Sequence, residues 1–510
     1  MPELPKTLVP RFRIDGTLTT LGPLRIGSGG LAEARIPRKG KRGSSVEVQE
    51  VFLDASGRAY IPGSSLKGFL RNYLESRGVA HGLWRSMFGY QEATSLDDPR
   101  GKGLGGAITV RDARLRDGEL PLNIQDPYWD PRRATSVASH VVIERRTRTA
   151  KEELLFFEEY VPAGISFAVT LLVEGGDRNG QEAEEMAAEL LAALKGLRGS
   201  SARLGASNAE GWGWLEWKLG LVRRLTEASM RTWLAKPGSL LLNHLEAVDS
   251  APLIGRPEAR TEKPRWLTFD VDLNVRGPFL VNDPSKVKQK GEDSGRPNHS
   301  PLRTAEDAPV LPGSSLHGAL RSQAERIVRT LGGGVAETTV KGREDLGRLD
   351  AVSCLFGAAG WRSPVRVSEF TLAPGSPKPE RKTQEFVAID RFTGGGADAL
   401  KFNAEGFVAG GPEGFTLRGS IALDTTALER LMKDRKPPLT TGGSKPDWKD
   451  LAYLFAYTIR DLCEGDVPLG FGRSKGYGAC SGTVTAAHAA SFGPDVQWFA
   501  TLLNQGGENR

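Results

Sequence analysis

An internal duplication constrains the fold of this chain more than any other feature of its sequence. Residues 62–66 read Pro-Gly-Ser-Ser-Leu, and residues 312–316 repeat these five residues 250 positions later. Four further matches follow in the same order: Met87–Gly89 with Leu355–Gly357, Ile108–Ala113 with Val365–Phe370, Val142–Thr147 with Ala388–Thr393, and Gly211–Gly213 with Gly476–Gly478. Collinear matches at a long period indicate repeated structural units. The sequence therefore predicts two domain copies, copy one at residues 1–250 and copy two at 263–510, with a linker at 251–262.

Both copies have the same predicted order of elements. A strand with alternating apolar residues opens each copy, at 11–19 and at 267–275. The Pro-Gly-Ser-Ser turn then leads into a helix, for which Ser64 is the expected N-cap. The apolar residues of these helices have helical spacing and are Leu66, Phe69, Leu70, Tyr73 and Leu74 in copy one, and Leu316, Ala319, Leu320 and Ile327 in copy two. Later helices near 181–197 and 448–462, with strands around them, predict an α+β fold with a ferredoxin-like core.

Composition narrows the class of protein. The chain has 510 residues, of which 39% are hydrophobic and 25% charged, as expected for a folded protein with a sizeable core. It has no apolar run near the roughly 18 residues that a membrane span needs, so no membrane partner is expected. Its three cysteines and six histidines lack the spacing of zinc ligands or of a disulfide framework. This pattern favours a cytoplasmic protein.

Clustered basic residues indicate an anionic partner. The net charge is +6, and Arg145, Arg146 and Arg148 crowd one short segment of copy one. Like charges at this density repel one another, and a phosphate backbone would relieve the repulsion. A solvated basic loop explains any single cluster equally well.

A glycine-rich segment near the end of copy two carries a second basic group. Residues 469–478 interleave four glycines with Phe471, Arg473, Lys475 and Tyr477. Glycines let a backbone approach a ligand closely, so Arg473 and Lys475 are expected to contact phosphate while an aromatic ring stacks on a base. A structural turn with aromatic core residues is the alternative. The corresponding segment of copy one, residues 204–213, lacks the basic pair.

The two Gly-Ser-Ser-Leu helix starts are a further candidate RNA contact. A helix N-terminus presents free N–H groups and the positive end of the helix dipole, which suits a phosphate. The residues predicted to bind RNA there are Ser64, Ser65, Lys67 and Arg71 in copy one, and Ser314, Ser315, His317 and Arg321 in copy two. An ordinary capped amphipathic helix fits these residues as well.

Taken together, these motifs resemble the RAMP superfamily of CRISPR-associated proteins. The resemblance rests on Ile-Pro-Gly-Ser-Ser-Leu-Lys-Gly at 61–68, Phe-Gly at 88–89, Ile-Asp-Arg-Phe-Thr at 389–393 and Gly-Arg-Ser-Lys-Gly-Tyr-Gly at 472–478. It is closest to the backbone subunit of type III effector complexes, in the double-copy form of fused, type III-D-like systems. It implies two RRM-like domains with long inserted thumb loops, which bind guide RNA and single-stranded target RNA beside other effector subunits. It also places Arg391 and the Arg145–Arg148 cluster near the thumbs.

The same resemblance implies a catalytic acid in the loop before each Pro-Gly-Ser-Ser turn, which supports cleavage of target RNA with Mg²⁺ or Mn²⁺. The usual pattern there is Asp-x-Pro-Val, whereas copy two has His299 at the position of the acid, and copy one has no Asp-x-Pro. The candidates, in order of preference, are Asp283, which would also bind the metal, then Asp293, then Glu47. Solvated loop acids are the alternative for each of them.

Two other functions fit the sequence. One is a standalone RAMP endoribonuclease that processes precursor guide RNA without a metal, through a histidine or tyrosine base. The other is a scaffold subunit without catalysis. A cleavage assay with and without EDTA separates metal-dependent cleavage of target RNA from a scaffold function, and copurified RNA and partner subunits separate it from a standalone endoribonuclease.

Overall fold

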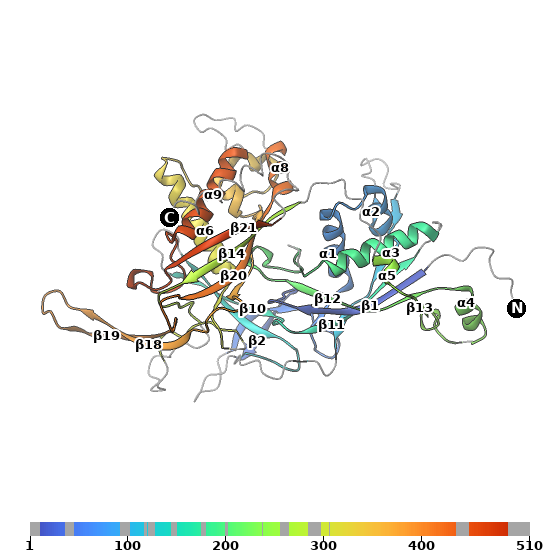
Figure 1. The fold of residues 1–510 in the computed structure, drawn as a ribbon, viewed down its shortest axis with the longest axis horizontal. Helices are drawn as coiled ribbons and strands as arrows, with labels where there is room; N and C mark the ends of the chain where they lie inside the picture. The colour runs from blue at the N-terminus through green and yellow to red at the C-terminus, as the bar shows by residue number, and fades with distance from the viewer. Residues whose placement is uncertain are drawn as a thin grey trace.

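The computed structural model describes residues 11–35, 45–91, 103–116, 120, 128–143, 150–174, 180–198, 202–236, 238–254, 265–283, 297–304, 307–434 and 448–487. Figure 1 shows the two copies side by side, copy one in blue to green and copy two in yellow to red. Asp293 and the Arg145, Arg146 and Arg148 cluster lie outside the described residues.

Copy one is an α+β unit whose elements follow the predicted order. Its strands are β1 (Arg11–Thr20), β2 (Gly27–Arg35), β3 (Ser45–Val51), β4 (Tyr60–Ile61), β5 (Gly89–Gln91), β6 (Gly103–Gly105), β7 (Ile108–Val110), β8 (Ala113–Leu115), β9 (Ser136–Ile143), β10 (Ala150–Tyr160), β11 (Ser166–Glu174), β12 (Leu215–Arg224) and β13 (Glu246–Ala247). Its helices are α1 (Gly63–Ser76), α2 (His81–Phe88), α3 (Gly180–Lys195), α4 (Glu227–Leu234) and α5 (Ala251–Ile254), with short 3-10 turns η1 (Asn208–Glu210) and η2 (Leu241–Asn243).

Copy two repeats this organisation. Its strands are β14 (Trp266–Val275), β15 (Val310–Leu311), β16 (Val365–Val367), β17 (Phe370–Leu372), β18 (Glu380–Ile389), β19 (Gly396–Val408), β20 (Phe415–Asp424) and β21 (Cys480–Ala487). Its helices are α6 (Gly313–Thr330), α7 (Ala351–Phe356), α8 (Thr425–Asp434) and α9 (Trp448–Glu464), with 3-10 turns η4 (Arg343–Arg348) and η5 (Arg473–Lys475). The α+β prediction is confirmed.

One antiparallel sheet forms the centre of each copy. Its strand order is β13-β12-β1-β11-β8-β4 in copy one and β15-β17-β20-β14-β21 in copy two, with β7 on β11 and β16 on β20. The opening strand therefore lies within each sheet, between β11 and β12 in copy one and between β20 and β21 in copy two. This arrangement is typical of ferredoxin-like folds. The narrower RRM-like description stays a prediction.

In each copy, the sheet and its helices pack around a separate hydrophobic core. The five apolar residues predicted for α1 are all buried, and Leu316, Ala319 and Leu320 of α6 are buried as well. The core of copy one extends from Phe12 to Val222 and that of copy two from Leu267 to Cys480, as two separate clusters. Two cores are what two fused domains require. The exact domain bounds stay a prediction, and the predicted linker begins with the helical turn α5.

The cap predicted for α1 is wrong. The helix begins two residues earlier than expected, with Pro62 as N-cap and no side-chain cap from its own turn. The N–H of Gly63 instead donates to Oδ1 of Asp112 at 2.8 Å. Asp112 comes from the loop between β7 and β8, so the cap is a long-range contact that local helix rules do not anticipate.

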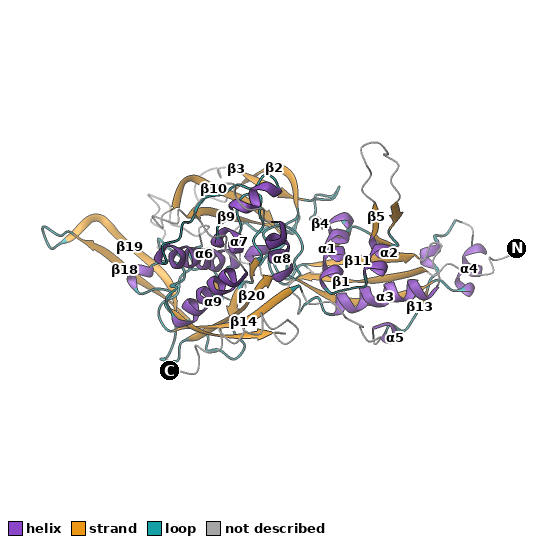
Figure 2. Cartoon of the chain, turned by 90° about the horizontal axis from the view of Figure 1, so that it is seen from above, coloured by secondary structure: helices purple, strands orange, loops and turns teal. Residues whose placement is uncertain are grey.

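The two copies differ in the hairpin that follows the central strands. In copy one, the β9–β10 hairpin belongs to a four-stranded sheet of order β2-β3-β10-β9. In copy two, β18 and β19 form a sheet of two strands over the described residues, and isolated bridges join β19 to Phe279 and His299. Figures 1 and 2 show this hairpin extending away from the body of the protein. Copy two therefore presents a projecting hairpin whose base lies near its glycine-rich segment.

Candidate functional site

The glycine-rich segment of copy two forms a closed loop, called here the copy-two loop (residues 469–478). The N–H of Leu469 donates to the carbonyl of Gly478 at 2.9 Å, which closes the loop at its base. Gly472 and Gly476 flank η5 with φ angles of 78° and 79°, in the left-handed region that side chains disfavour. Arg473 and Lys475 lie on the turn between these glycines and are exposed. The loop thus presents the predicted basic pair at its tip.

The segment that leaves β14 fixes the position of this loop. The N–H of Phe471 donates to the carbonyl of Leu280 at 2.7 Å, and that of Gly478 donates to the carbonyl of Pro278 at 2.8 Å. A Cβ atom at Gly470 would overlap the same Leu280 carbonyl, so this position needs glycine. The base of the loop is therefore held by backbone contacts that tolerate little change.

The base of the β18–β19 hairpin meets the same place. Phe279 exchanges backbone hydrogen bonds with Phe407 of β19, at 2.8 and 2.9 Å. The carbonyl of His299 accepts from the N–H of Glu405 at 2.9 Å, and the Tyr477 hydroxyl donates to the side chain of Gln384 at 3.0 Å. Three parts of copy two that are far apart in sequence thus converge on one site.

Five aromatic rings line this meeting point, and they are called here the aromatic group: His299, Phe386, Phe402, Phe471 and Tyr477. The centroids of the His299 and Phe471 rings are 4.2 Å apart, and those of Phe386 and Phe402 are 5.0 Å apart. The ammonium of Lys475 lies 5.7 Å from the Phe402 ring centroid and 5.8 Å from that of Phe386. Except for the buried Tyr477, these rings are partly exposed. Burial lowers the pKa of His299, which favours a neutral imidazole.

Asp283, the first choice among the predicted catalytic acids, lies at the edge of this site. Its N–H donates to the carbonyl of Ser300 at 2.8 Å, which makes it a neighbour of the His299 segment. Its side chain is buried, with 6% of the residue exposed. Glu47 is exposed on β3, where it pairs across the hairpin with Glu33.

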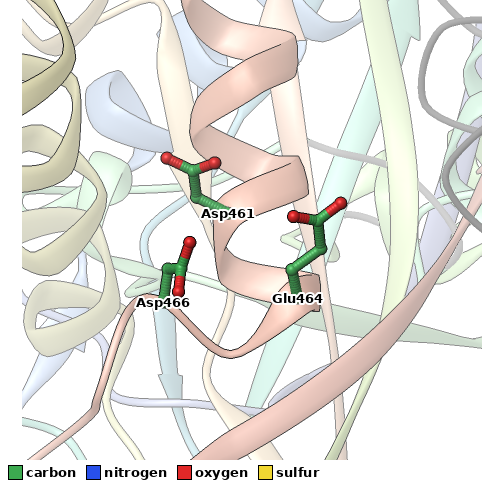
Figure 3. Close-up of side chains that lie close together, drawn as sticks. All are labelled: Asp461, Glu464 and Asp466. Atoms are coloured by element: carbon green, nitrogen blue, oxygen red, sulfur yellow. The ribbon is translucent and has the colours of Figure 1, made fainter.

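Carboxylate oxygens suit Mg²⁺ or Mn²⁺, and Mg²⁺ is commonly bound through one or two carboxylates together with water and substrate phosphates. Asp283 fits that pattern as one ligand. Within the described part of the chain, the one group of three acids with mutually close oxygens is Asp461, Glu464 and Asp466, all within 4.8 Å. Figure 3 shows this group at the C-terminal end of α9, where Asp466 follows the helix. Asp283 is not a member of it.

Copy one has a loop of the same backbone design at residues 204–213. Leu204 donates to the carbonyl of Gly213 at 3.0 Å, and Gly213 donates to that of Pro23 at 2.7 Å, as Leu469 and Gly478 do in copy two. The 3-10 turn η1 takes the place of η5, so Asn208 and Glu210 stand where copy two has Arg473 and Lys475.

The copy-one loop is covered by copy two at the seam between the domains. A Cβ atom at Gly211 would lie 2.8 Å from the carbonyl oxygen of Val367, and one at Gly313 would overlap the carbonyl of Glu210. Burial raises the pKa of Glu210, and the nearby Glu158 adds to this effect. Burial also raises the pKa of Glu369 to about 7. The start of α6 therefore receives a protein contact from copy one.

Some of the remaining residues predicted to bind RNA are exposed to solvent, and others have contacts within the protein. Ser64 and Arg71 are exposed on α1, Ser65 and Lys67 are partly exposed, and the Arg71 guanidinium lies 4.7 Å from the centroid of the Trp84 ring. On α6, Ser315 is exposed and Ser314 is partly exposed. Arg391 is exposed at the turn of the β18–β19 hairpin. These groups are accessible to a ligand from solvent.

His317 and Arg321 of α6 have contacts within the protein. His317 hydrogen-bonds Oγ of Ser363 at 3.1 Å, and burial lowers its pKa to about 4. The Arg321 guanidinium donates to the carbonyl of Gly357 at 2.8 Å. Both side chains hold α6 against the end of α7.

Sequence reasoning missed two features of the site. The first is the aromatic group, in which cross-strand pairing brings Phe386 beside Phe402 and a bridge to Ala404 brings His299 to β19. The second is the apolar tip of the hairpin, where Phe392 is 100% exposed. The Asp390 carboxylate accepts from the N–H groups of Phe392 and Thr393, both at 2.8 Å, and so shapes this turn.

Comparison with known proteins gives one family. The model of the RAMP superfamily matches residues 17–216 and again residues 266–481. No curated protein matches the chain. Each matched region lies within one of the two predicted copies.

Proposed function

The chain belongs to the RAMP superfamily, and we propose that it is the guide-RNA-binding backbone subunit of a type III CRISPR effector complex. RAMP membership implies a CRISPR-associated RNA-binding subunit that acts in a multi-subunit assembly. The tandem copies favour the fused, type III-D-like form. The observation that carries the proposal is the basic, exposed copy-two loop beside a projecting hairpin.

Every helix in the described part of the chain is too short or too polar to cross a membrane. We propose that the complex acts in the cytoplasm.

In this proposal, guide RNA follows the exposed basic groups of the chain. Arg473 and Lys475 hold its phosphates, and the exposed residues of α1 and the hairpin turn extend the path. Phosphate contacts fix the position of a nucleic acid and carry no sequence information. A subunit that must accept any guide sequence needs this kind of contact.

RNA affinity should fall steeply with salt, and the double variant Arg473→Ala/Lys475→Ala should flatten that dependence. Each phosphate contact on a single strand contributes a slope of about −0.7 in log affinity against log salt, so losing two contacts removes about 1.4. Fluorescence anisotropy with single-stranded RNA at several salt concentrations measures the slope. Lys195→Ala/Lys236→Ala removes two exposed charges from copy one and is the matched control. Equal slopes for the wild type and the loop variant would exclude these contacts.

The β18–β19 hairpin is the proposed thumb that interrupts pairing between guide and target. Its exposed apolar residues are Val387, Ile389, Phe392 and Leu400. An apolar side chain inserted between base steps unstacks them at a cost of a few kcal/mol. Phe392 at the tip is placed to act as that wedge.

Phe392→Ala should restore stacking at the interrupted position. A 2-aminopurine in the target reports this, because its fluorescence is strong when unstacked and falls when stacked. We expect the signal in the assembled complex to fall at least about twofold, given the unstacking cost of a few kcal/mol. Lys401→Ala on the same hairpin is the control. An unchanged signal with Phe392→Ala would rule out the wedge.

The proposal includes cleavage of target RNA, with Asp283 as the metal-binding acid. A bound Mg²⁺ or Mn²⁺ would stabilise the charge that develops on the cleaved phosphate. Asp283 would hold that ion from a backbone held by its hydrogen bond to Ser300, and the buried position of its side chain limits competing water. Cleavage that persists in EDTA would instead favour a metal-independent endoribonuclease, and intact RNA under all conditions would favour a scaffold subunit.

A further inference from the structure

A short stretch of copy two, called here the bridging segment (residues 298–302), lies between Asp283 and the β18–β19 hairpin. On one side of it, the N–H of Asp283 donates to the carbonyl of Ser300 at 2.8 Å. On the other side, a parallel bridge joins His299 to Ala404, in the part of β19 called here the hairpin root (residues 403–408). Neighbouring strands lie about 4.8 Å apart, so one strand width of backbone separates Asp283 from the hairpin root.

A reciprocal pair of asparagines fastens the bridging segment to the hairpin root. The N–H of Asn298 donates to Oδ1 of Asn403 at 2.7 Å, and the N–H of Asn403 donates to Oδ1 of Asn298 at 2.9 Å. Both residues are partly buried. Removing the acceptor of a buried N–H costs the desolvation of that group as well as the hydrogen bond. The pair therefore holds the two backbones together more firmly than the bridge between His299 and Ala404 does alone.

Copy one has the same backbone arrangement, with β3 in the place of the bridging segment. Leu24 and Val161 exchange two backbone hydrogen bonds of 2.8 Å, as Phe279 and Phe407 do in copy two. Strand β3 pairs in parallel with β10, as the bridging segment does with β19. These shared contacts define which residues of the two copies correspond.

The side chains at the corresponding positions differ. Counting along the strands from the shared contacts gives three matched pairs: Val48 with Asn298, Phe157 with Asn403, and Ser28 with Asp283. Copy two thus has the acid and the asparagine pair together, whereas copy one has a hydroxyl and two apolar side chains at these positions. Polar side chains cost more to bury than apolar ones unless they are hydrogen-bonded. A polar pair that accompanies the acid indicates a role in holding it.

We infer that the hairpin root sets the position of Asp283, with Asn403 as a positioning residue that acts through Asn298 and the bridging segment. A displacement of about 1 Å at a reacting group costs about 100-fold in rate, so an acid that binds a catalytic ion needs such support. The inference rests on the proposed function, since it assumes that Asp283 supports cleavage. It goes further in making a residue of the proposed thumb necessary for cleavage by the same copy.

Hydrogen exchange of the full-length protein measures whether the hairpin root holds the bridging segment. Asn403→Ala removes the acceptor of the Asn298 N–H, and the loss of one hydrogen bond corresponds to about a fivefold shift in a local opening equilibrium. The amide of Asp283, which bonds the carbonyl of Ser300, should therefore exchange about fivefold faster. Asn403→Asp keeps an acceptor at the same place and should exchange as the wild type does.

Cleavage of target RNA in the assembled complex measures the consequence for the reaction. With saturating target in a single turnover, Asn403→Ala should slow cleavage at the position that depends on Asp283 by about tenfold or more, while the affinity for target stays unchanged. Asn403→Asp should restore the rate, which a general loss of stability would not allow. Asn274→Ala is the matched control, because it removes an asparagine side chain that bonds the carbonyl of Glu413 at 2.9 Å, away from the bridging segment.

A second variant covers the case in which Asn403→Ala fails to fold. Asn298→Ala removes the other bond of the pair and should have the same two effects. Unchanged exchange at Asp283 in these variants, or faster exchange with cleavage at the full rate, would overturn the inference. Intact target RNA with the wild type, or full cleavage by Asp283→Asn, would instead contradict the proposed cleavage itself, and the exchange at Asp283 would still decide whether the hairpin root holds this segment.

Discussion

Replacing Asp283 by asparagine should abolish cleavage of target RNA at one position in the assembled complex, while guide and target RNA stay bound. Asparagine keeps the shape of the buried side chain and removes the charge that a divalent ion needs. Metal stabilisation of a transition state is worth several kcal/mol, and each 1.36 kcal/mol is a tenfold change in rate. We therefore expect a loss of at least about 100-fold at that position, measured with end-labelled target RNA and Mg²⁺ or Mn²⁺.

Three comparisons make this result specific. Asp270→Asn changes an exposed acid on β14 of the same copy and should leave cleavage intact. Asp293→Asn tests the second candidate of copy two, and Glu47→Gln tests copy one. If the variants of Asp283, Asp293 and Glu47 all cleave fully, the catalytic groups lie on another subunit and this chain is a scaffold.

Gly478→Ala should remove most of the RNA affinity of the copy-two loop. Gly478 has a φ of 71°, and a Cβ atom there would overlap the carbonyl of Leu469, the residue whose N–H closes the loop. The left-handed conformation alone costs roughly 1–2 kcal/mol for a residue with a Cβ atom. Opening the loop also displaces Arg473, Lys475 and Phe471 together, so we expect affinity for single-stranded RNA to fall about tenfold or more, as the loss of one stacked base alone implies.

Gly476→Ala is the matched control for this experiment. Gly476 has a similar φ of 79°, but no atom lies within 4 Å of a Cβ atom placed there. The variant therefore has the same backbone penalty without the overlap. Equal RNA affinity for the two variants would mean that closure of the loop does not organise the binding groups. Thermal unfolding of both variants would show whether a global loss of stability causes the change in affinity instead.

Much of the fold could be predicted from local patterns and from the duplication. Apolar spacing identified the buried face of α1, and the repeated Phe-Gly pairs mark helix ends at which Gly89 and Gly357 adopt φ angles of 79° and 86°. Such features depend on residues a few positions apart. A periodic pattern therefore predicts them reliably.

The site was less predictable because long-range contacts form it. The cap of α1 comes from Asp112 rather than Ser64, and the aromatic group joins His299 to Phe471, 172 positions later in the chain. The seam explains why Glu210 stands where copy two has Lys475, since that position of copy one faces the start of α6. The sequence shows that only the copy-two loop has a basic pair, but it does not show the contact with copy two that covers the copy-one loop.

The most direct test of the central claim is to identify the RNA that this chain binds in its own cell. The full-length tagged protein should be purified under native conditions, and its RNA sequenced together with an input sample. The account predicts strong enrichment of CRISPR RNA of defined length, copurified with other effector subunits. Protein free of RNA, or RNA with the composition of the total cellular pool, would contradict it.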